Sequence, residues 1–284
     1  ENADIFISSY YTTPITTPSV LMVHDMIPEV MGWDLNHPMW QEKHDGIQHA
    51  SAYIAVSENT ARDLVKCFPD INSDSITVAP LGVKNIFKPA EAGDINTFKT
   101  KYGITKPYFL LVGPSTGYKN STLFFAAFAQ LASRNGFDIV CTGSGGILAP
   151  EWRTYTSGST VHMLQLSDEE LAIAYSGAIV LAYPSKYEGF GLPILEAMAC
   201  GCPIITCANA SIPEVAGEAA IYVNDNDAEE LANALCEVQK PGIRQLLVNR
   251  GIEQAKKFTW SSTAKTVTSV LIDTTISALN LREI

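Results

Sequence analysis

The sequence contains few basic residues. Nineteen Lys and Arg stand against 30 Asp and Glu, so the formal net charge at pH 7 is −11. A protein that binds nucleic acid needs clustered Lys and Arg to neutralise the phosphate backbone, and this charge balance argues against such a partner. Any phosphate group that the chain binds must therefore be held locally, by backbone amides and one or two basic side chains.

Long apolar runs are also absent. No stretch approaches the roughly 20 apolar residues that span a bilayer, so the sequence predicts no membrane-spanning helix. With 46% hydrophobic and 17% charged residues, the composition is that of an ordinary globular protein. At 284 residues the chain is long enough for two modest domains or one large one.

Recognisable metal and disulfide motifs are missing as well. Cys200 and Cys202 lack zinc-finger spacing and have no matching second pair, and four of the six cysteines lie in or beside apolar segments. Reduced thiols in a cytosolic protein are the expectation. No paired-acid motif joins the acidic residues near Asp25, and Asp225 and Asp227 lie in a polar turn, so we expect neither a metal nor another cofactor.

The most informative segment of the chain is residues 185–204, which read SKYEGFGLPILEAMACGCPI. Residues 178–184 before it form an apolar run, which predicts a short buried strand. A helix is predicted over 193–200, with Pro193 at its first position and Gly201 just after its end. The segment therefore joins a strand to a helix.

Two carboxylates flank this junction. Glu188 lies before the turn and Glu196 about one helical turn inside, so both can reach one small polyhydroxyl ligand. Gly189 and Gly191 let the backbone approach a ligand, and the N–H groups at a helix start favour negative charge. Either glutamate alone would more simply be solvated or paired with the helix dipole. Together, at the carboxyl end of a strand, they indicate a site for a nucleotide diphosphate-sugar.

Glu188 and Glu196, set in the sequences EGFGLP and EAMACG, resemble the donor-site signature of the family-4 retaining glycosyltransferases of GT-B fold. The resemblance implies that Glu188 contacts hydroxyls of the donor sugar and that Glu196 binds the ribose hydroxyls. It also implies that backbone amides of this turn hold the sugar and the phosphate. The candidate donor-binding residues of the segment are Glu188, Gly189, Phe190, Gly191, Leu192 and Glu196.

Apolar runs and helical patterns alternate from residue 106 onward. This alternation indicates βαβ units and a parallel sheet. We therefore predict a Rossmann-like, nucleotide-sugar-binding domain over residues 90–258. Strands are predicted at 108–113, 138–143, 160–164, 178–184, 203–206 and 219–223, and helices at 121–133, 167–176, 193–200 and 227–238.

The first ninety residues are organised differently. Strands are predicted at 4–8, 19–24, 52–57 and 76–79, and Ser57 is expected to cap a helix. The segments VHDMIP and VSENT resemble late parts of the family's N-terminal domain, whose first strands are missing from this chain. On this resemblance, residues 1–89 are the second half of an N-terminal, acceptor-side Rossmann-like domain with a linker. Residues 259–284 are predicted to form a C-terminal helix that crosses back to that domain.

The predicted fold is thus α/β and of GT-B type. It comprises two Rossmann-like domains with parallel sheets that face a cleft, and the N-terminal domain is incomplete.

The segment after the first strand of the 90–258 domain carries a candidate cation. Gly113 begins a turn, and Lys119 lies just before a predicted helix, where it could pair with a diphosphate; the alternative is a solvated loop lysine. The family usually has an Arg a few residues earlier, and this chain has none. We therefore expect Ser115 or Thr116 to supply hydroxyl groups to the phosphates instead.

Three further features have alternative interpretations. His24 ends an apolar strand, where a lone His is commonly structural, but the resemblance implies that it hydrogen-bonds the donor sugar or steadies developing charge. Leu164 ends a predicted strand at the point where the family binds the nucleotide base through backbone groups. Residues 143–146 form a partial Gly-x-Gly pattern, which predicts either a phosphate loop or a tight turn.

The resemblance implies a metal-independent, retaining glycosyltransferase of polysaccharide biosynthesis, with His24, Lys119 and Glu188 as the catalytic candidates. A UDP-sugar such as UDP-glucose is the favoured donor and GDP-mannose the next, and the acceptor is expected to be a glycan or a lipid-linked sugar. The protein is expected in the cytoplasm, and any peripheral contact with the inner face of the membrane is expected from the missing N-terminal part. Two alternatives stay open: a non-catalytic sugar-nucleotide-binding module and a GT-B-type sugar-nucleotide epimerase.

Overall fold

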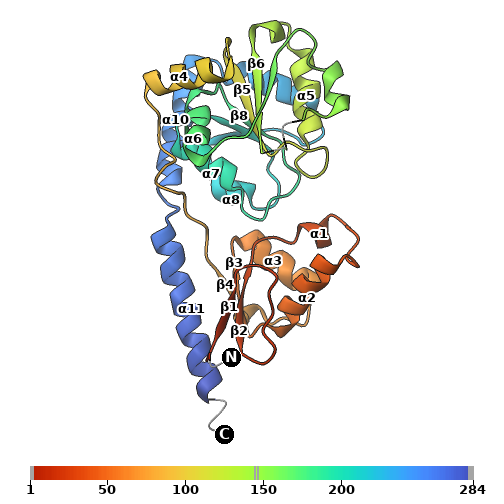
Figure 1. Ribbon diagram of the computed structural model, residues 1–284, viewed down its shortest axis with the longest axis vertical. Coiled ribbons are helices and arrows are strands. Elements are labelled where there is room, and N and C mark those ends of the chain that lie inside the picture. Colours follow the sequence, from red (N-terminus) through yellow and green to blue (C-terminus); the bar gives the residue numbers. More distant parts are fainter. Residues whose placement is uncertain (1–2, 144, 146, 281–284) are drawn as a thin grey trace. The chain divides into compact units, whose positions relative to one another are not determined.

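The computed structural model describes residues 3–143, 145 and 147–280 (Figure 1). The chain divides into two compact units. Unit 1 comprises Glu1–Gly82, Glu188–Phe190 and Phe258–Ile284, and unit 2 comprises Val83–Tyr187 and Gly191–Lys257. No feature of the sequence predicted that three residues of the 185–204 motif, Glu188–Phe190, would group with unit 1. The domain limits drawn at residues 89 and 258 stay predictions.

Unit 2 is built on a six-stranded parallel sheet with the order β10-β9-β8-β5-β6-β7. Its central strands are continuous apolar runs, as expected where helices cover both faces of a sheet. The chain order along the sheet reverses between β8 and β5, as in the doubly wound Rossmann arrangement. The α/β class predicted for this part is confirmed. The strands are β5 (Tyr108–Val112), β6 (Asp138–Thr142), β7 (Val161–Leu164), β8 (Leu181–Tyr183), β9 (Ile204–Thr206) and β10 (Ala220–Tyr222).

Two groups of helices cover this sheet. Helices α5 and α9 pack together over one face, where Phe124, Phe125 and Phe128 form a buried aromatic core. Helices α4, α6, α7 and α10 form a second contiguous group (Figure 1). The helices are α4 (Ala92–Tyr102), α5 (Ser121–Gln130), α6 (Asp168–Gly177), α7 (Leu192–Ala199), α8 (Ile212–Ala216), α9 (Ala228–Glu237) and α10 (Pro241–Ala255), with 3₁₀ turns at Arg134–Gly136 and Pro150–Thr154.

Local signals account for several of these boundaries. A capping box begins α6, within the helix predicted over 167–176: the Ser167 hydroxyl accepts from the Glu170 N–H at 3.3 Å, and the Glu170 carboxylate accepts from the Ser167 N–H at 3.2 Å. Helix α5 ends at Gln130, not at Ser133 as predicted, because Leu131 takes an extended ψ of 119°. The strands are also one to four residues shorter than predicted, chiefly at their ends.

Unit 1 contains a four-stranded parallel sheet with the order β1-β2-β3-β4. Successive side chains of β2 point to opposite faces. Val20 joins a cluster with residues of α11, whereas Leu21 joins one with Ile47 of α2 and Leu64 of α3. The elements are β1 (Phe6–Ser8), β2 (Ser19–Val23), β3 (Ala52–Ala55), β4 (Ile76–Val78), α1 (Ile27–Val30), α2 (Pro38–His49), α3 (Glu58–Cys67), a 3₁₀ turn (Ser73–Ser75) and α11 (Trp260–Asn280).

Helix α11 is the longest helix of the described chain and packs on β2 and β3 (Figure 1). Its start is fixed by Thr263, whose hydroxyl donates to the carbonyl of Pro80 at 2.6 Å. A side chain at Gly82 would overlap the backbone of Trp260, so the close approach of these two backbone segments requires glycine at position 82. Within the described residues, no helix combines the length and apolar character that crossing a membrane requires.

Candidate functional site

The carboxyl edge of the unit 2 sheet gathers most of the predicted site residues. Strands β5 and β8 are neighbours, and the chain order reverses between them. Ligands of open α/β sheets bind at such a switch point, where the loops that follow the two strands diverge. The loop after β5 carries Gly113 to Lys119, and the loop after β8 leads into α7.

Hydrogen bonds fix the loop that follows β5. Gly113 has a φ of +63°, which favours glycine, and its N–H donates to the carbonyl of Thr142 at 2.7 Å. Ser115 and Ser121 are joined twice: the Ser115 N–H donates to the Ser121 hydroxyl at 3.2 Å, and the Ser121 N–H donates to the Ser115 carbonyl at 3.1 Å. The exposed Thr116 lies at the tip of this closed turn.

Asn120 holds the same loop against two other segments. It adopts the left-handed conformation with a φ of 53°, which Asn tolerates better than most residues. Its amide donates to the carbonyl of Pro184 at 3.2 Å and to that of Asp225 at 2.8 Å. The sequence analysis did not identify this role. The available signal in the sequence was an Asn directly before a predicted helix.

Lys119 lies against two aromatic rings. Its ammonium donates to the Tyr183 hydroxyl at 2.8 Å, and it sits 4.9 Å from the centre of that ring and 5.2 Å from the ring of Tyr118. The electron-rich faces of these rings attract the cation and help to hold it in position. Since Tyr183 ends β8, the positive charge of Lys119 is located at the switch point.

The start of α7 has no side-chain cap. Gly191 precedes the helix with a φ of +100° and has no side chain that could cap it, and the helix begins at Leu192, one residue before the predicted Pro193. Such a start presents backbone N–H groups and the positive end of the helix dipole. A phosphate group suits this position.

Glu196 lies one turn into α7 and is partly buried. Burial, to which the nearby Asp168 charge adds, raises the pKa of its carboxyl to about 7. The Tyr175 hydroxyl donates to Glu196 Oε2 at 3.0 Å and opposes this rise, as does the charge of Lys84. The carboxyl therefore changes charge near neutral pH. A hydroxyl ligand would bind its ionised form.

Two other predicted features lie at the same edge. Leu164 is the last residue of β7 and is half-buried. Gly143 follows β6 with a φ of +78°, and Gly145 has a φ of +73°, so both need glycine. Ser144 and Gly146 of the Gly-x-Gly pattern lie outside the described residues.

In unit 1, the segment 188–190 packs against the end of β2. A side chain at Gly189 would overlap the carbonyl oxygen of His24 and come within 2.7 Å of Asp25 Cβ. The carbonyl of Gly189 accepts hydrogen bonds from the Ser57 hydroxyl at 2.6 Å and the Thr60 hydroxyl at 3.0 Å. The first turn of α3 thus binds this segment of the motif.

The residues next to Gly189 are also buried or make defined contacts. Glu188 is 7% exposed, although the sequence suggested a loop residue. Phe190 packs edge-on against Phe258 with ring centres 5.8 Å apart. His24, directly after β2, donates from Nε2 to the Ser9 carbonyl at 2.8 Å. That bond orients the imidazole ring. The predicted contact of His24 with a sugar stays a prediction.

Comparisons with known proteins agree with this geometry. Residues 106–240 match the model of the family "Glycosyl transferases group 1". The match spans 135 of the 284 residues of the chain. The chain is 28% identical over 260 residues to O-antigen chain mannosyltransferase B of Escherichia coli, covering 86% of the chain and 67% of that protein. It is 24% identical over 280 residues to serotype-specific mannosyltransferase WbdA of Escherichia coli, covering 93% of the chain and 34% of that protein.

The fold of the chain is shared with solved structures. The Anabaena Alr3699/HepE protein, solved with UDP and glucose, matches with a TM-score of 0.73 at 16% identity, covering 90% of this chain and 71% of that one. A likeness at this identity shows the fold alone. The chain has the predicted GT-B type of α/β fold.

The sequence located the glycosyltransferase motif but not its partners. Gly113, Ser115, Lys119, Leu192 and Glu196 lie in loops and a helix start at the carboxyl edge of the unit 2 sheet. His24 and Gly189 lie together in unit 1. The sequence analysis missed the residues that orient these site residues in both units, because they come from distant segments. They are Ser57, Thr60, Asn120, Tyr175 and Tyr183.

Proposed function

We propose that this protein is a retaining, metal-independent glycosyltransferase that moves a hexose from a nucleotide diphosphate-sugar to a glycan or lipid-linked acceptor. One observation carries the proposal. A cation, an uncapped helix start and a partly buried carboxyl occupy the switch point of a Rossmann-like sheet. These are the groups that a diphosphate and a ribose require.

Each part of the donor would have its own partner. The diphosphate would lie at the N-terminus of α7 and near Lys119, whose charge offsets its own. The ribose hydroxyls would donate to the ionised carboxyl of Glu196. Backbone groups near Leu164, at the end of β7, would contact the base. Glu188 would bind hydroxyls of the transferred sugar.

The reaction would break the bond between the anomeric carbon and the diphosphate oxygen. As negative charge develops on the departing diphosphate, Lys119 and the α7 amides would stabilise it. The acceptor hydroxyl would attack the anomeric carbon from the face that the diphosphate leaves, which retains configuration. Its proton would pass to the departing phosphate oxygen, and His24 would steady the positive charge that develops on the sugar ring.

The comparisons favour mannose as the transferred sugar. Both Escherichia coli relatives are mannosyltransferases, and the name of one places it in O-antigen chain synthesis. The Anabaena neighbour was instead solved with UDP and glucose, which agrees with the donor favoured by the sequence. We therefore propose GDP-mannose as the first donor to test and UDP-glucose as the second.

Calorimetric titration of the 284-residue chain with both donors tests the proposal. We expect one of them to bind, and Glu196→Gln to weaken that binding. Transfer to acceptor, followed by NMR of the anomeric proton, then tests the stereochemistry. Donor binding without any transfer or hydrolysis would favour the non-catalytic module, and conversion of the sugar to its epimer would favour the epimerase. Binding of neither donor would refute the proposal.

A further inference from the structure

Four aromatic side chains form a connected cluster in unit 1. Tyr10 and Tyr11 stack with ring centres 4.0 Å apart, the Tyr11 ring lies 6.1 Å from that of Trp40, and the Trp33 ring lies 5.7 Å from that of Trp40. Tyr10 is 57% exposed and Trp33 is 42% exposed. We call Tyr10, Tyr11, Trp33 and Trp40 the aromatic platform. The mechanism above does not use it.

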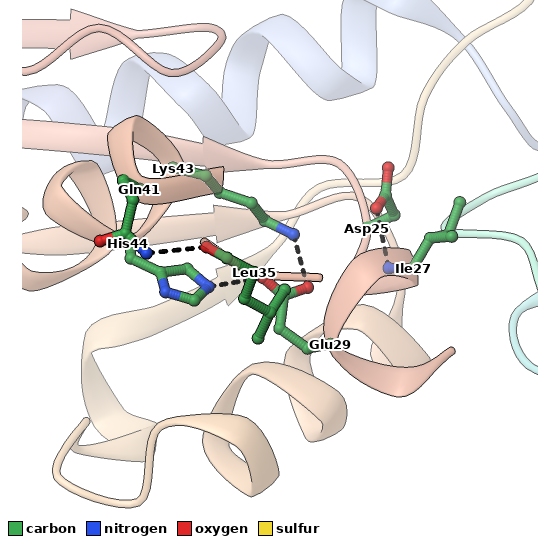
Figure 2. Close-up of polar contacts among 7 residues, drawn as sticks. All are labelled: Asp25, Ile27, Glu29, Leu35, Gln41, Lys43 and His44. Atoms are coloured by element: carbon green, nitrogen blue, oxygen red, sulfur yellow. Dashed lines mark hydrogen bonds and ion pairs between the residues drawn. The ribbon is translucent and has the colours of Figure 1, made fainter. Parts of the chain in front are cut away.

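The segment that carries the two tryptophans is held rigidly. Glu29 of α1 accepts hydrogen bonds from Lys43 of α2 at 2.8 Å and from His44 Nε2 at 3.0 Å (Figure 2). The Lys43 and Glu29 side chains are 3% and 6% exposed, so the pair is shielded from water. The Gln41 amide donates to the Leu35 carbonyl at 2.7 Å, which closes the loop between the helices (Figure 2). The tryptophans are therefore positioned before any ligand arrives.

The surface around the platform is acidic. Residues 1–61 contain eight Asp and Glu, and Lys43 is their one Lys or Arg. Because Lys43 is buried against Glu29, its charge is compensated internally. Asp34, Glu42 and Asp45 are exposed nearby on the loop and on α2. Such a surface repels phosphates and anionic lipid headgroups, and it accepts hydrogen bonds from neutral hydroxyl groups.

The platform is continuous with the part of the site in unit 1. Tyr10 follows Ser9, whose carbonyl accepts the hydrogen bond of His24. Asp25, next to His24, is in contact distance of Gly189 and accepts from the Ile27 N–H at 2.9 Å. The charges of Asp25 and Glu29 add to the burial that raises the pKa of Tyr11. Aromatic rings and carboxylates therefore occur together beside the segment predicted to touch the donor sugar.

We propose that the aromatic platform binds neutral pyranose units of the acceptor glycan. This inference rests on the proposed function and adds the part of unit 1 that recognises the acceptor. The C–H groups on one face of a pyranose carry slight positive charge and pack on the negative face of an aromatic ring. Its hydroxyl groups donate to carboxylates at the ring edge. The platform supplies rings for the apolar face, and the exposed Asp34 and Glu42, close to Trp33 and Trp40 in the sequence, supply carboxylates for the hydroxyls.

Exposed Trp and Tyr also occur where proteins meet a membrane surface. That occupant is less well matched here, because anionic headgroups attract basic segments and this surface is acidic. Binding to lipid vesicles, measured in the same experiment, decides between a membrane surface and a glycan.

The experiment begins with the 284-residue chain on an array of immobilised neutral oligosaccharides that contain mannose, glucose, galactose, rhamnose or N-acetylhexosamine. The affinity for the oligosaccharide bound best is then measured by calorimetry. Trp33→Ala and Tyr10→Ala remove exposed rings of the platform. Trp260→Ala is the matched control, because Trp260 is 44% exposed on α11, outside the platform. Melting temperatures confirm that each variant folds.

We expect each platform variant to lose at least about tenfold in affinity for the oligosaccharide and Trp260→Ala to lose less than twofold. Affinity for GDP-mannose or UDP-glucose should not change in any of the three variants. A failure of the platform proposal can therefore be told apart from a failure of the proposed donor site. Absence of oligosaccharide binding by the parent chain would overturn the inference. So would unchanged binding in the platform variants, or binding to phosphatidylglycerol vesicles that requires Trp33 and Tyr10.

Discussion

The charge of Glu196 should control donor affinity near neutral pH. Burial raises the pKa of this carboxyl to about 7 in the chain without ligand. The ionised form accepts hydrogen bonds at both oxygens, whereas the protonated form replaces one acceptor with an O–H donor. Ribose hydroxyls would donate to the ionised form. Donor affinity should therefore rise as the pH rises through 7.

The size of the effect follows from the fraction of ionised carboxyl. With a pKa of about 7, about 9% of Glu196 is ionised at pH 6 and about 91% at pH 8. When only one form binds, the apparent affinity scales with the fraction of that form. The dissociation constant should fall about tenfold between pH 6 and pH 8.

Calorimetry with GDP-mannose and UDP-glucose measures this directly. These donors are preferable to free UDP, because a terminal phosphate itself titrates near pH 6. Glu196→Gln is the control: its amide does not titrate, so its affinity should be lower at pH 8 and vary little with pH. Tyr175→Phe removes the hydrogen bond that favours the ionised form and should move the midpoint to higher pH. A flat profile for the parent chain, or the same slope in Glu196→Gln, would refute the reasoning.

The stability of the protein should show the opposite trend. The ordinary pKa of 4.5 describes the unfolded chain, and the folded value is about 7. Between these values the folded state binds the proton more tightly, so the contribution of Glu196 to stability is lost as pH rises from about 4.5 to 7. Glu196→Gln should therefore gain stability relative to the parent chain at pH 8, in thermal melts without ligand.

Three further outcomes test other parts of the molecule. Gly189→Ala should lower the free energy of unfolding by about 1–3 kcal/mol in denaturant titrations, because the added methyl group would overlap the His24 carbonyl and displace the Gly189 carbonyl from its partners. The same change should weaken sugar recognition more than nucleotide binding. An unchanged denaturation midpoint would contradict this packing. Lys43→Met should cost about 3–5 kcal/mol by leaving Glu29 without its buried cation, and the further change Glu29→Leu should restore much of the loss. EDTA should leave donor affinity unchanged, and a loss that Mn²⁺ or Mg²⁺ reverses would show that a metal takes part.

The elements that the sequence predicted are those with strong local signals. Ser57 forms the predicted cap, Ser167 caps the helix predicted over 167–176, and the apolar runs around β5 and β8 are strands. Helix α4 buries Phe98 alone among its residues, and α10 is 15 residues long but buries three. An apolar stripe of this kind is too sparse to be recognised by periodicity, and both helices were missed.

The candidate site, like the fold, was predicted where the signals are local in the sequence. A contiguous motif is visible in sequence, so Glu196, Gly191 and the start of α7 could be found. The environment of those residues depends on segments that are distant in the chain. Tyr175 lies 21 residues before Glu196, and Ser57 lies 132 residues before Gly189. No local spacing links these pairs, since parallel strands and their connections bring them together.

Electrostatics separates the two ligands that this chain is proposed to bind. A net charge of −11 repels an anionic donor at long range, but salt at about 0.1 M screens charges beyond about 10 Å. The diphosphate must then be held by groups in direct contact with it, which Lys119 and the α7 amides provide. Residues 1–61, which carry the aromatic platform, contain Lys43 as their one Lys or Arg, and Lys43 is paired with Glu29. A neutral glycan can approach the platform at little electrostatic cost, whereas a nucleotide cannot. Under these two proposals, the distribution of a few basic side chains would direct the charged donor to unit 2 and the neutral glycan to unit 1.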